Sequence, residues 1–362
     1  MNAAVRDAAL VHGGDERVVE ARRRSPSVER LMSAFRLHND QTYTPSAIVY
    51  RADAPETVSG PALIAFRNAM ALSFVLRSWA TETTNDEVLY SDSFDIFPAY
   101  PTDAGRLLIV TPATRSLFST GAKFIATPSP IGRLSPSYLA QDYYIGRAAA
   151  ECWCRCYQRG QNDRFSRSLF RSLEIAYAAA SAPSRSNATE QEWGNNLALW
   201  VSAIEVLAHP RAHRRTGNVN RTEALNLLSP CRWGDKRLDR MRPRALPENK
   251  KKFSTPMNAI QFVYLHLHHA RNKYLHGDAT PRHIMFPFKR ARETSLVMLA
   301  PLVYRTALFS YLRTKVRPYQ GFTNAEWRNP RARPHLYPMV ADRMRLNEAL
   351  SRMLWPGRDD LR

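Results

Sequence analysis

Three side chains near position 271 have the types that phosphodiester chemistry uses. Arg271, Asn272 and His276 follow one another closely along the chain. A guanidinium offers a phosphate a fixed fork of donors and stays charged near neutral pH, whereas an imidazole can give or take a proton there. The amide of Asn272 could fix the orientation of the imidazole. On spacing alone, a surface or structural role at a helix end is the more common interpretation of such a pair.

An amphipathic segment over residues 256–275 must position these side chains. Pro256 suits its first turn, and Gly277 suits its C-terminal end. At about 100° per residue, Arg271 and His276 would lie about 140° apart on an unbroken helix. We therefore expect the helix to end or turn before Gly277, so that both side chains can point into one cleft. The apolar positions at three- and four-residue spacing are Ile260, Val263, Tyr264, Leu267, Ala270 and Tyr274.

A second helix, predicted over residues 190–209, carries a carboxylate near its apolar face. Glu205 follows Val201 by four positions and lies beside Ile204. Because a buried carboxylate needs a partner, we expect Glu205 to pair with Arg271 or another arginine of the motif. An exposed position at the boundary of the face is the alternative.

Both segments resemble a known family. Residues 271–277, RNKYLHG, resemble the R-N-x-x-x-H-G form of the R-x4-6-H signature of HEPN-domain ribonucleases, in particular the ApeA-like HEPN group. Residues 197–207, LALWVSAIEVL, resemble the early helix of that family. The resemblance covers about residues 160–315 and leaves residues 1–158 outside it.

The resemblance implies a metal-independent endoribonuclease on a small helical bundle, commonly a homodimer with the paired motifs at the interface. It implies that His276 transfers protons while a ribose 2′-hydroxyl attacks the adjacent phosphate, and that Arg271 stabilises the phosphate charge. Asn272 matches the polar residue that often follows the arginine, and Glu205 and His269 are expected to support the cleft. Such proteins often serve as toxins or in anti-phage defence, so an antitoxin or a phage-derived activator is a further expected partner.

Two other functions fit parts of the sequence. A catalytically inactive HEPN-like module would bind RNA or a protein partner through its basic surface, and would not need Arg271 and His276 to converge. A DNA-binding regulator would need a helix-turn-helix, which we do not find in the sequence.

The overall composition favours a folded protein with a polyanionic partner. The 362 residues carry a formal net charge of +20, and 44% of them are hydrophobic. Arginine dominates the basic residues, which fits phosphate recognition and equally a GC-rich genome. No run approaches the roughly eighteen apolar residues of a spanning helix, and no secretory signal is evident. We therefore expect a cytoplasmic protein without a membrane partner.

A basic insertion over residues 210–254 is the predicted RNA-binding segment. Residues 211–252 hold thirteen basic and four acidic side chains. Basic side chains could follow an RNA backbone while Trp233 stacks on a base, although a solvated loop is the common alternative. The predicted contacts are Arg232, Trp233, Arg237, Arg240, Lys250, Lys251, Lys252 and, in the motif itself, Lys273.

Neither the cysteines nor the histidines predict a metal site. Cys152, Cys154 and Cys156 lack the two-to-four-residue spacing of zinc ligands, even with Cys231 added, so buried reduced thiols are the stronger interpretation. His266 and His269 lie three apart on one helix face, but no carboxylate or thiol cluster accompanies them. We expect no metal and no cofactor.

The predicted fold class is α+β, a mixed α/β N-terminal domain followed by an all-α HEPN-type helical bundle. A basic, partly disordered leader over residues 1–40 precedes the mixed domain of residues 41–158, for which we expect a sensing or regulatory role. Residues 159–315 form the helical domain, and residues 316–362 are a Pro- and Arg-rich extension. The pattern predicts helices over residues 27–37, 63–79, 163–180, 290–315 and 339–354, and strands over residues 46–51, 88–90, 94–97, 107–110 and 124–126.

Overall fold

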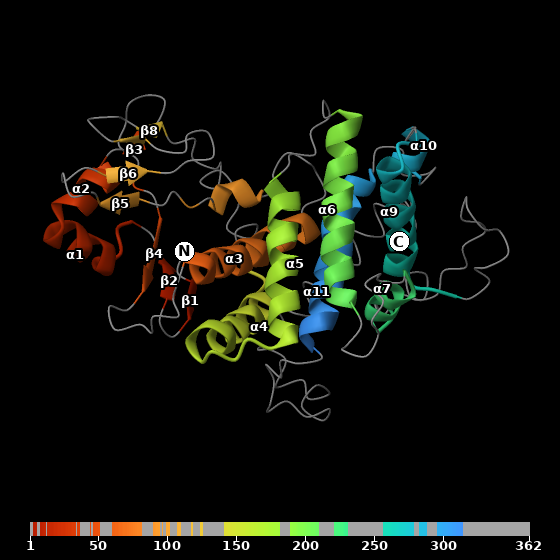
Figure 1. Ribbon diagram of the computed structural model, residues 1–362, viewed down its shortest axis with the longest axis horizontal. Helices are drawn as coiled ribbons and strands as arrows, with labels where there is room; N and C mark the ends of the chain where they lie inside the picture. The colour runs from red at the N-terminus through yellow and green to blue at the C-terminus, as the bar shows by residue number, and fades with distance from the viewer. Residues whose placement is uncertain are drawn as a thin grey trace, which may run out of the picture.

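The computed structural model of the protein describes separate stretches of the chain, and most of the described residues are helical (Figure 1). The described residues are 3–5, 8–11, 13–33, 35–36, 44, 46–50, 60–81, 90–94, 96, 99–101, 107–109, 117–118, 124–125, 141–181, 189–209, 221–230, 256–278, 282–287 and 295–313. The predicted helix over residues 339–354 lies outside them.

The α-helices are α1 (Glu16–Arg24), α2 (Pro26–Ser33), α3 (Gly60–Thr81), α4 (Tyr143–Trp153), α5 (Arg164–Ser181), α6 (Glu190–Ala208), α7 (Arg221–Leu228), α9 (Ala259–Leu275), α10 (Arg282–Met285) and α11 (Leu296–Arg313). A 3-10 helix, η1 (Ser91–Phe94), and a π-helix, η3 (Cys154–Gln158), join them. The strands are β1 (Ala3–Val5), β2 (Ala8–Val11), β3 (Phe35–Arg36), β4 (Ala47–Tyr50), β5 (Ala99–Pro101), β6 (Leu107–Ile109), β7 (Leu117–Phe118) and β8 (Phe124–Ile125).

One hydrophobic core runs through α3, α4, α5, α6, α9 and α11. α6 contacts α5, α9 and α11, and it lies between α5 and α9 (Figure 1). Trp153, Trp200 and Tyr304 are among the largest fully buried side chains of this core. The predicted N-terminal domain includes α3 and α4, yet α3 packs against α5 and α11, and α4 packs against α3 and α11. The boundary predicted at residue 158 therefore runs through one continuous core.

The described strands form three small sheets. β1, β2 and β4 are antiparallel neighbours, β5, β6 and β7 likewise, and β3 pairs with β8 in parallel. Residues 1–40, predicted as a partly disordered leader, contain β1, β2, α1, α2 and β3 among their described residues. The helix predicted over residues 27–37 appears as α2, which already ends at Ser33. A mixed α/β domain over residues 41–158 stays a prediction.

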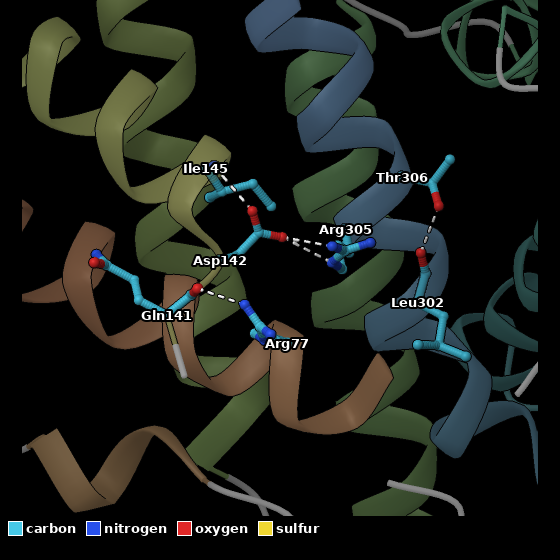
Figure 2. A network of polar contacts seen from close by, with 7 residues as sticks. All are labelled: Arg77, Gln141, Asp142, Ile145, Leu302, Arg305 and Thr306. Carbon is cyan, nitrogen blue, oxygen red and sulfur yellow. Dashed lines mark hydrogen bonds and ion pairs between the residues drawn. The ribbon is translucent and has the colours of Figure 1, made fainter. Parts of the chain in front are cut away.

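A buried ion pair fastens the start of α4 to α11 (Figure 2). Asp142 is 3% exposed and caps α4, because its Oδ1 accepts from the backbone N–H of Ile145 at 3.1 Å. Its Oδ2 accepts from Arg305 Nη2 at 2.6 Å and from Nε at 3.0 Å. On α3, Arg77 donates to the carbonyl of Gln141 at 2.9 Å. The same turn of chain is thus held from α3, α4 and α11.

Within the described ranges, no helix is both long and apolar enough to cross a membrane.

Candidate functional site at the α6–α9 contact

The helix that carries the motif, α9, has a capped start and a sharp end. Asn258 is its N-cap and forms a capping box with Gln261, at 2.9 and 3.0 Å, so the helix begins slightly later than predicted. At the other end Gly277 has φ +75°, and the N–H of Asp278 donates to the carbonyl of Lys273 at 2.9 Å. This is a Schellman motif, and it confirms the predicted end of the helix before Gly277.

α6 and α9 pack tightly at a glycine. A Cβ atom placed on Gly194 of α6 would lie 2.1 Å from the ring of Tyr274 on α9. The Tyr274 hydroxyl donates to Asn195 Oδ1 at 2.7 Å. The absence of a side chain at Gly194 therefore sets the separation of the two helices beside the motif.

We expect Gly194→Ala to lower the free energy of unfolding by about 1–3 kcal/mol, because the added methyl group overlaps the Tyr274 ring and forces α6 and α9 apart. Chemical denaturation of the purified variant measures this change. Gly146→Ala on α4 is the matched control: its Cβ would meet only the flexible end of Gln141, so its effect should be smaller. A Gly194→Ala variant as stable as the wild type would show that α6 and α9 do not pack as described.

Four polar side chains form a ring between α6 and α9, in which three contacts are hydrogen bonds or an ion pair and the fourth, between His268 and Glu205, is longer. Arg271 forms an ion pair with Glu205 through Nη2, and its Nη1 donates to Asn272 Oδ1 at 3.0 Å. Asn272 Nδ2 lies 3.3 Å from His268 Nδ1, and His268 Nε2 lies 3.9 Å from Glu205 Oε1. The amide nitrogen can only donate, so His268 Nδ1 accepts and its proton resides on Nε2, facing Glu205. The predicted pairing of Glu205 with Arg271 is confirmed.

The ring lies in a largely desolvated environment. The side chains of Arg271 and Glu205 are 17% and 19% exposed. Burial raises the pKa of Glu205, while the guanidinium of Arg271 opposes this change. Burial also raises the pKa of Tyr264, which lies on α9 with Arg271, and the Glu205 carboxylate adds to that effect. The site therefore holds one buried charge against another, and it fixes the guanidinium firmly.

The other predicted site residues on α9 lie away from this ring. His276 is exposed at the C-cap, where its backbone N–H donates to the carbonyl of Asn272 at 3.0 Å. No hydrogen bond or ion pair between its side chain and Arg271 occurs among the described residues. His269 is buried at 6% exposure, and Lys273 pairs with Asp278 at 3.6 Å. The convergence of Arg271 and His276 in one cleft thus stays a prediction.

His268 is the member of the ring that we did not predict. It precedes Arg271 by three positions and Asn272 by four, so all three share one face of the helix. This spacing was the available signal, but we assigned the supporting role to His269, which faces the core.

The remaining predictions concern the basic insertion and the cysteines. The segment that contains the predicted RNA contacts lies outside the described residues, and so does Cys231. These contacts are Arg232, Trp233, Arg237, Arg240, Lys250, Lys251 and Lys252.

Two of the cysteines, Cys152 and Cys156, are free thiols buried at the junction of α4 and η3. Burial raises the pKa of Cys152 to about 11, which keeps this thiol protonated at neutral pH.

The chain matches none of the protein-family models, curated proteins or solved structures with which it was compared. The function of the site is therefore argued from its own chemistry. A fixed guanidinium can stabilise a phosphate, and an exposed imidazole can transfer a proton. The two lie at the same end of α9.

Proposed function

We propose that the protein is a metal-independent endoribonuclease of the HEPN type. In this mechanism a 2′-hydroxyl of RNA attacks the adjacent phosphorus and its proton passes to His276. The bond from phosphorus to the 5′-oxygen of the next nucleotide breaks, and that oxygen takes a proton from water as it leaves. Arg271 stabilises the negative charge that accumulates on the phosphate oxygens. The products are a 2′,3′-cyclic phosphate and a 5′-hydroxyl. We further propose a cytoplasmic toxin or anti-phage effector, controlled by an antitoxin or a phage-derived activator.

The observation that carries the proposal is the fixed orientation of Arg271 beside the exposed end of α9. Glu205 and Asn272 hold the guanidinium in one place, so little side-chain entropy remains to be lost when a phosphate binds. The Schellman motif exposes His276 one turn further on, where a proton acceptor would be accessible to RNA. Arg271 therefore suits phosphate binding and His276 suits proton transfer, each by its own position on α9.

We propose that a homodimer brings the two groups together. Arg271 and His276 are not linked within one chain, and both lie near the C-terminal end of α9. If the α9 ends of two copies meet, the exposed His276 of one copy can approach a phosphate held by Arg271 of the other.

The second candidate is a catalytically inactive HEPN-like module that binds RNA or a protein partner. Its supporting observation is the Glu205 carboxylate, which already neutralises the guanidinium of Arg271. Such a module would bind RNA with strong salt dependence and leave it intact.

For residues 41–158 we propose a sensing or regulatory role. The supporting observation is that α3 and α4 share the core of α5 and α11, which would connect a change in this part of the chain directly to the helical bundle.

His276→Ala is expected to reduce RNA cleavage in the presence of EDTA by about 10²- to 10⁴-fold, because a proton-transfer group is lost. His283→Ala removes another exposed histidine, on α10, and should leave cleavage unchanged. The assay compares rates on a mixed RNA pool. Equal cleavage by His276→Ala and the wild type would remove His276 from the mechanism, and salt-sensitive RNA binding by a wild type that does not cleave would favour the inactive module.

A further inference from the structure

A cavity distant from the motif lies between α3, η3 and the first half of α5. Its volume is about 520 Å³, within the range of roughly 300–1,000 Å³ that small-molecule sites occupy. α5 and α6 both separate it from α9, since α3 contacts α5, α5 contacts α6 and α6 contacts α9. The cavity is therefore a separate site from the ring of polar side chains around Arg271.

The floor of the cavity contains a buried amide with a fixed orientation. Asn68 on α3 lines the cavity and is only 1% exposed. Its Oδ1 accepts from Arg67 Nε at 3.0 Å and from Nη2 at 2.9 Å. Because a guanidinium can only donate, these bonds assign the oxygen, and the NH2 group has no partner among the described residues. The NH2 group is therefore available to a ligand in the cavity that supplies an acceptor.

Arg67 itself is held in place, which makes the amide a rigid feature. Its guanidinium lies 4.0 Å from the centre of the Tyr177 ring on α5. The orientation of Asn68 is therefore set by a second layer of contacts.

Two guanidinium groups line the same cavity from α5. Arg167 and Arg171 are one helical turn apart and exposed. Neither side chain forms a hydrogen bond or ion pair with any residue that the structure describes. Glu174 also lines the cavity, so the local charge remains positive by one. Such a pair suits an anion with several acceptor oxygens, which a phosphate provides.

Two neighbouring aromatic rings form an apolar wall of the same cavity. The π-helix η3 brings Tyr157 into the cavity lining, and Phe170 of α5 lies next to it, with the ring centres 5.3 Å apart. Single π-helical turns are rare and often occur at functional sites. Burial raises the pKa of Tyr157 to about 12, so its hydroxyl stays neutral at physiological pH. The wall thus offers flat apolar surface for a planar ring.

We propose that this cavity binds a mononucleotide. Its phosphate contacts Arg167 and Arg171, its base packs against Tyr157 and Phe170, and a ring nitrogen or carbonyl oxygen of the base accepts from the Asn68 amide. The proposal is independent of RNA cleavage, because it uses none of the residues of the α6–α9 site.

Calorimetric titration of the full-length protein with the four nucleoside 5′-monophosphates tests the proposal directly. The corresponding nucleosides and inorganic phosphate are titrated separately. We expect saturable binding of at least one monophosphate, and at least tenfold weaker binding of its nucleoside and of phosphate alone. Absence of saturable binding for all four monophosphates at millimolar concentration would overturn the proposal, and so would phosphate binding as tight as that of the nucleotides.

Two variants locate the binding. Arg167→Ala/Arg171→Ala removes exposed side chains and should weaken nucleotide binding at least tenfold without changing the folded state. Asn68→Asp keeps an acceptor for Arg67 but replaces the NH2 donor by an oxygen, and should weaken binding to a similar degree. Arg159→Ala, which removes an exposed arginine at the end of η3 that does not line the cavity, is the control for the loss of an arginine outside the site. Equal affinity of the double variant and the control would place the nucleotide elsewhere.

Discussion

Asp142→Ala is expected to lower the free energy of unfolding by about 3–5 kcal/mol, because it leaves Arg305 as a buried charge without its partner. The side chain of Arg305 is 11% exposed, and among the described residues both of its hydrogen bonds go to Asp142 Oδ2. The same substitution removes the N-cap of α4. Urea denaturation followed by circular dichroism measures the difference.

Asp15→Ala is the matched control for this experiment. Asp15 also caps a helix, α1, and also pairs with an arginine, Arg17, whose side chain is 56% exposed. Since water solvates the guanidinium of Arg17 once Asp15 is removed, Asp15→Ala should lower the free energy of unfolding much less than Asp142→Ala. Similar effects of Asp142→Ala and Asp15→Ala would show that the Asp142–Arg305 pair is not desolvated.

Arg271→Met should destabilise the protein by about 2–3 kcal/mol at neutral pH, because the carboxylate of Glu205 then stays buried without a counter-charge. Methionine keeps much of the aliphatic volume, so packing changes little. Unfolding curves of Arg271→Met and the wild type are measured at several pH values. The loss of stability should vary with pH if it comes from the buried charge, and should not vary if it comes from a packing defect.

The sign of the pH dependence follows from the raised pKa of Glu205. Burial raises this pKa in the folded state, and Arg271 opposes the rise, so removing Arg271 raises the pKa further. A carboxyl with a raised folded pKa stabilises the fold below its unfolded value of about 4.5 and loses that contribution as the pH rises through the folded value. The deficit of Arg271→Met relative to the wild type should therefore be small near pH 4 and full by about pH 7.

The double variant Arg271→Met/Glu205→Gln completes the test. A neutral amide at position 205 needs no counter-charge, so most of the lost stability should return. Under the proposed mechanism RNA cleavage should be lost in both variants, since neither carries a guanidinium at position 271. A stability deficit of Arg271→Met that does not vary with pH would show that Glu205 is not its cause.

The elements that carry the candidate site could be predicted from the sequence because their signals are local. The apolar spacing over residues 256–275 and Gly277 located α9 and its end, and the apolar face beside Glu205 located α6. The ion pair between Glu205 and Arg271 followed from one rule, that a buried carboxylate requires a cation.

Features that depend on packing between distant segments could not be predicted in this way. The core that joins α3 to α11 depends on which apolar faces meet, and apolar spacing within a segment does not identify its neighbour. The choice of His268 rather than His269 for the ring depends on the rotation of α9 about its axis, which the contact of Tyr274 with Gly194 helps to set. The convergence of Arg271 with His276 in one cleft stays a prediction, because no polar contact between the two side chains occurs among the described residues.

The chemical identity of the product ends tests the proposed activity most directly. Wild-type protein is incubated with RNA in EDTA, and the ends of the fragments are determined by mass spectrometry. The Arg271/His276 mechanism predicts 2′,3′-cyclic phosphate and 5′-hydroxyl ends at every cleavage site, because the 2′-hydroxyl is the nucleophile. Fragments with 3′-hydroxyl and 5′-phosphate ends, or cleavage that stops when EDTA is added, would contradict it.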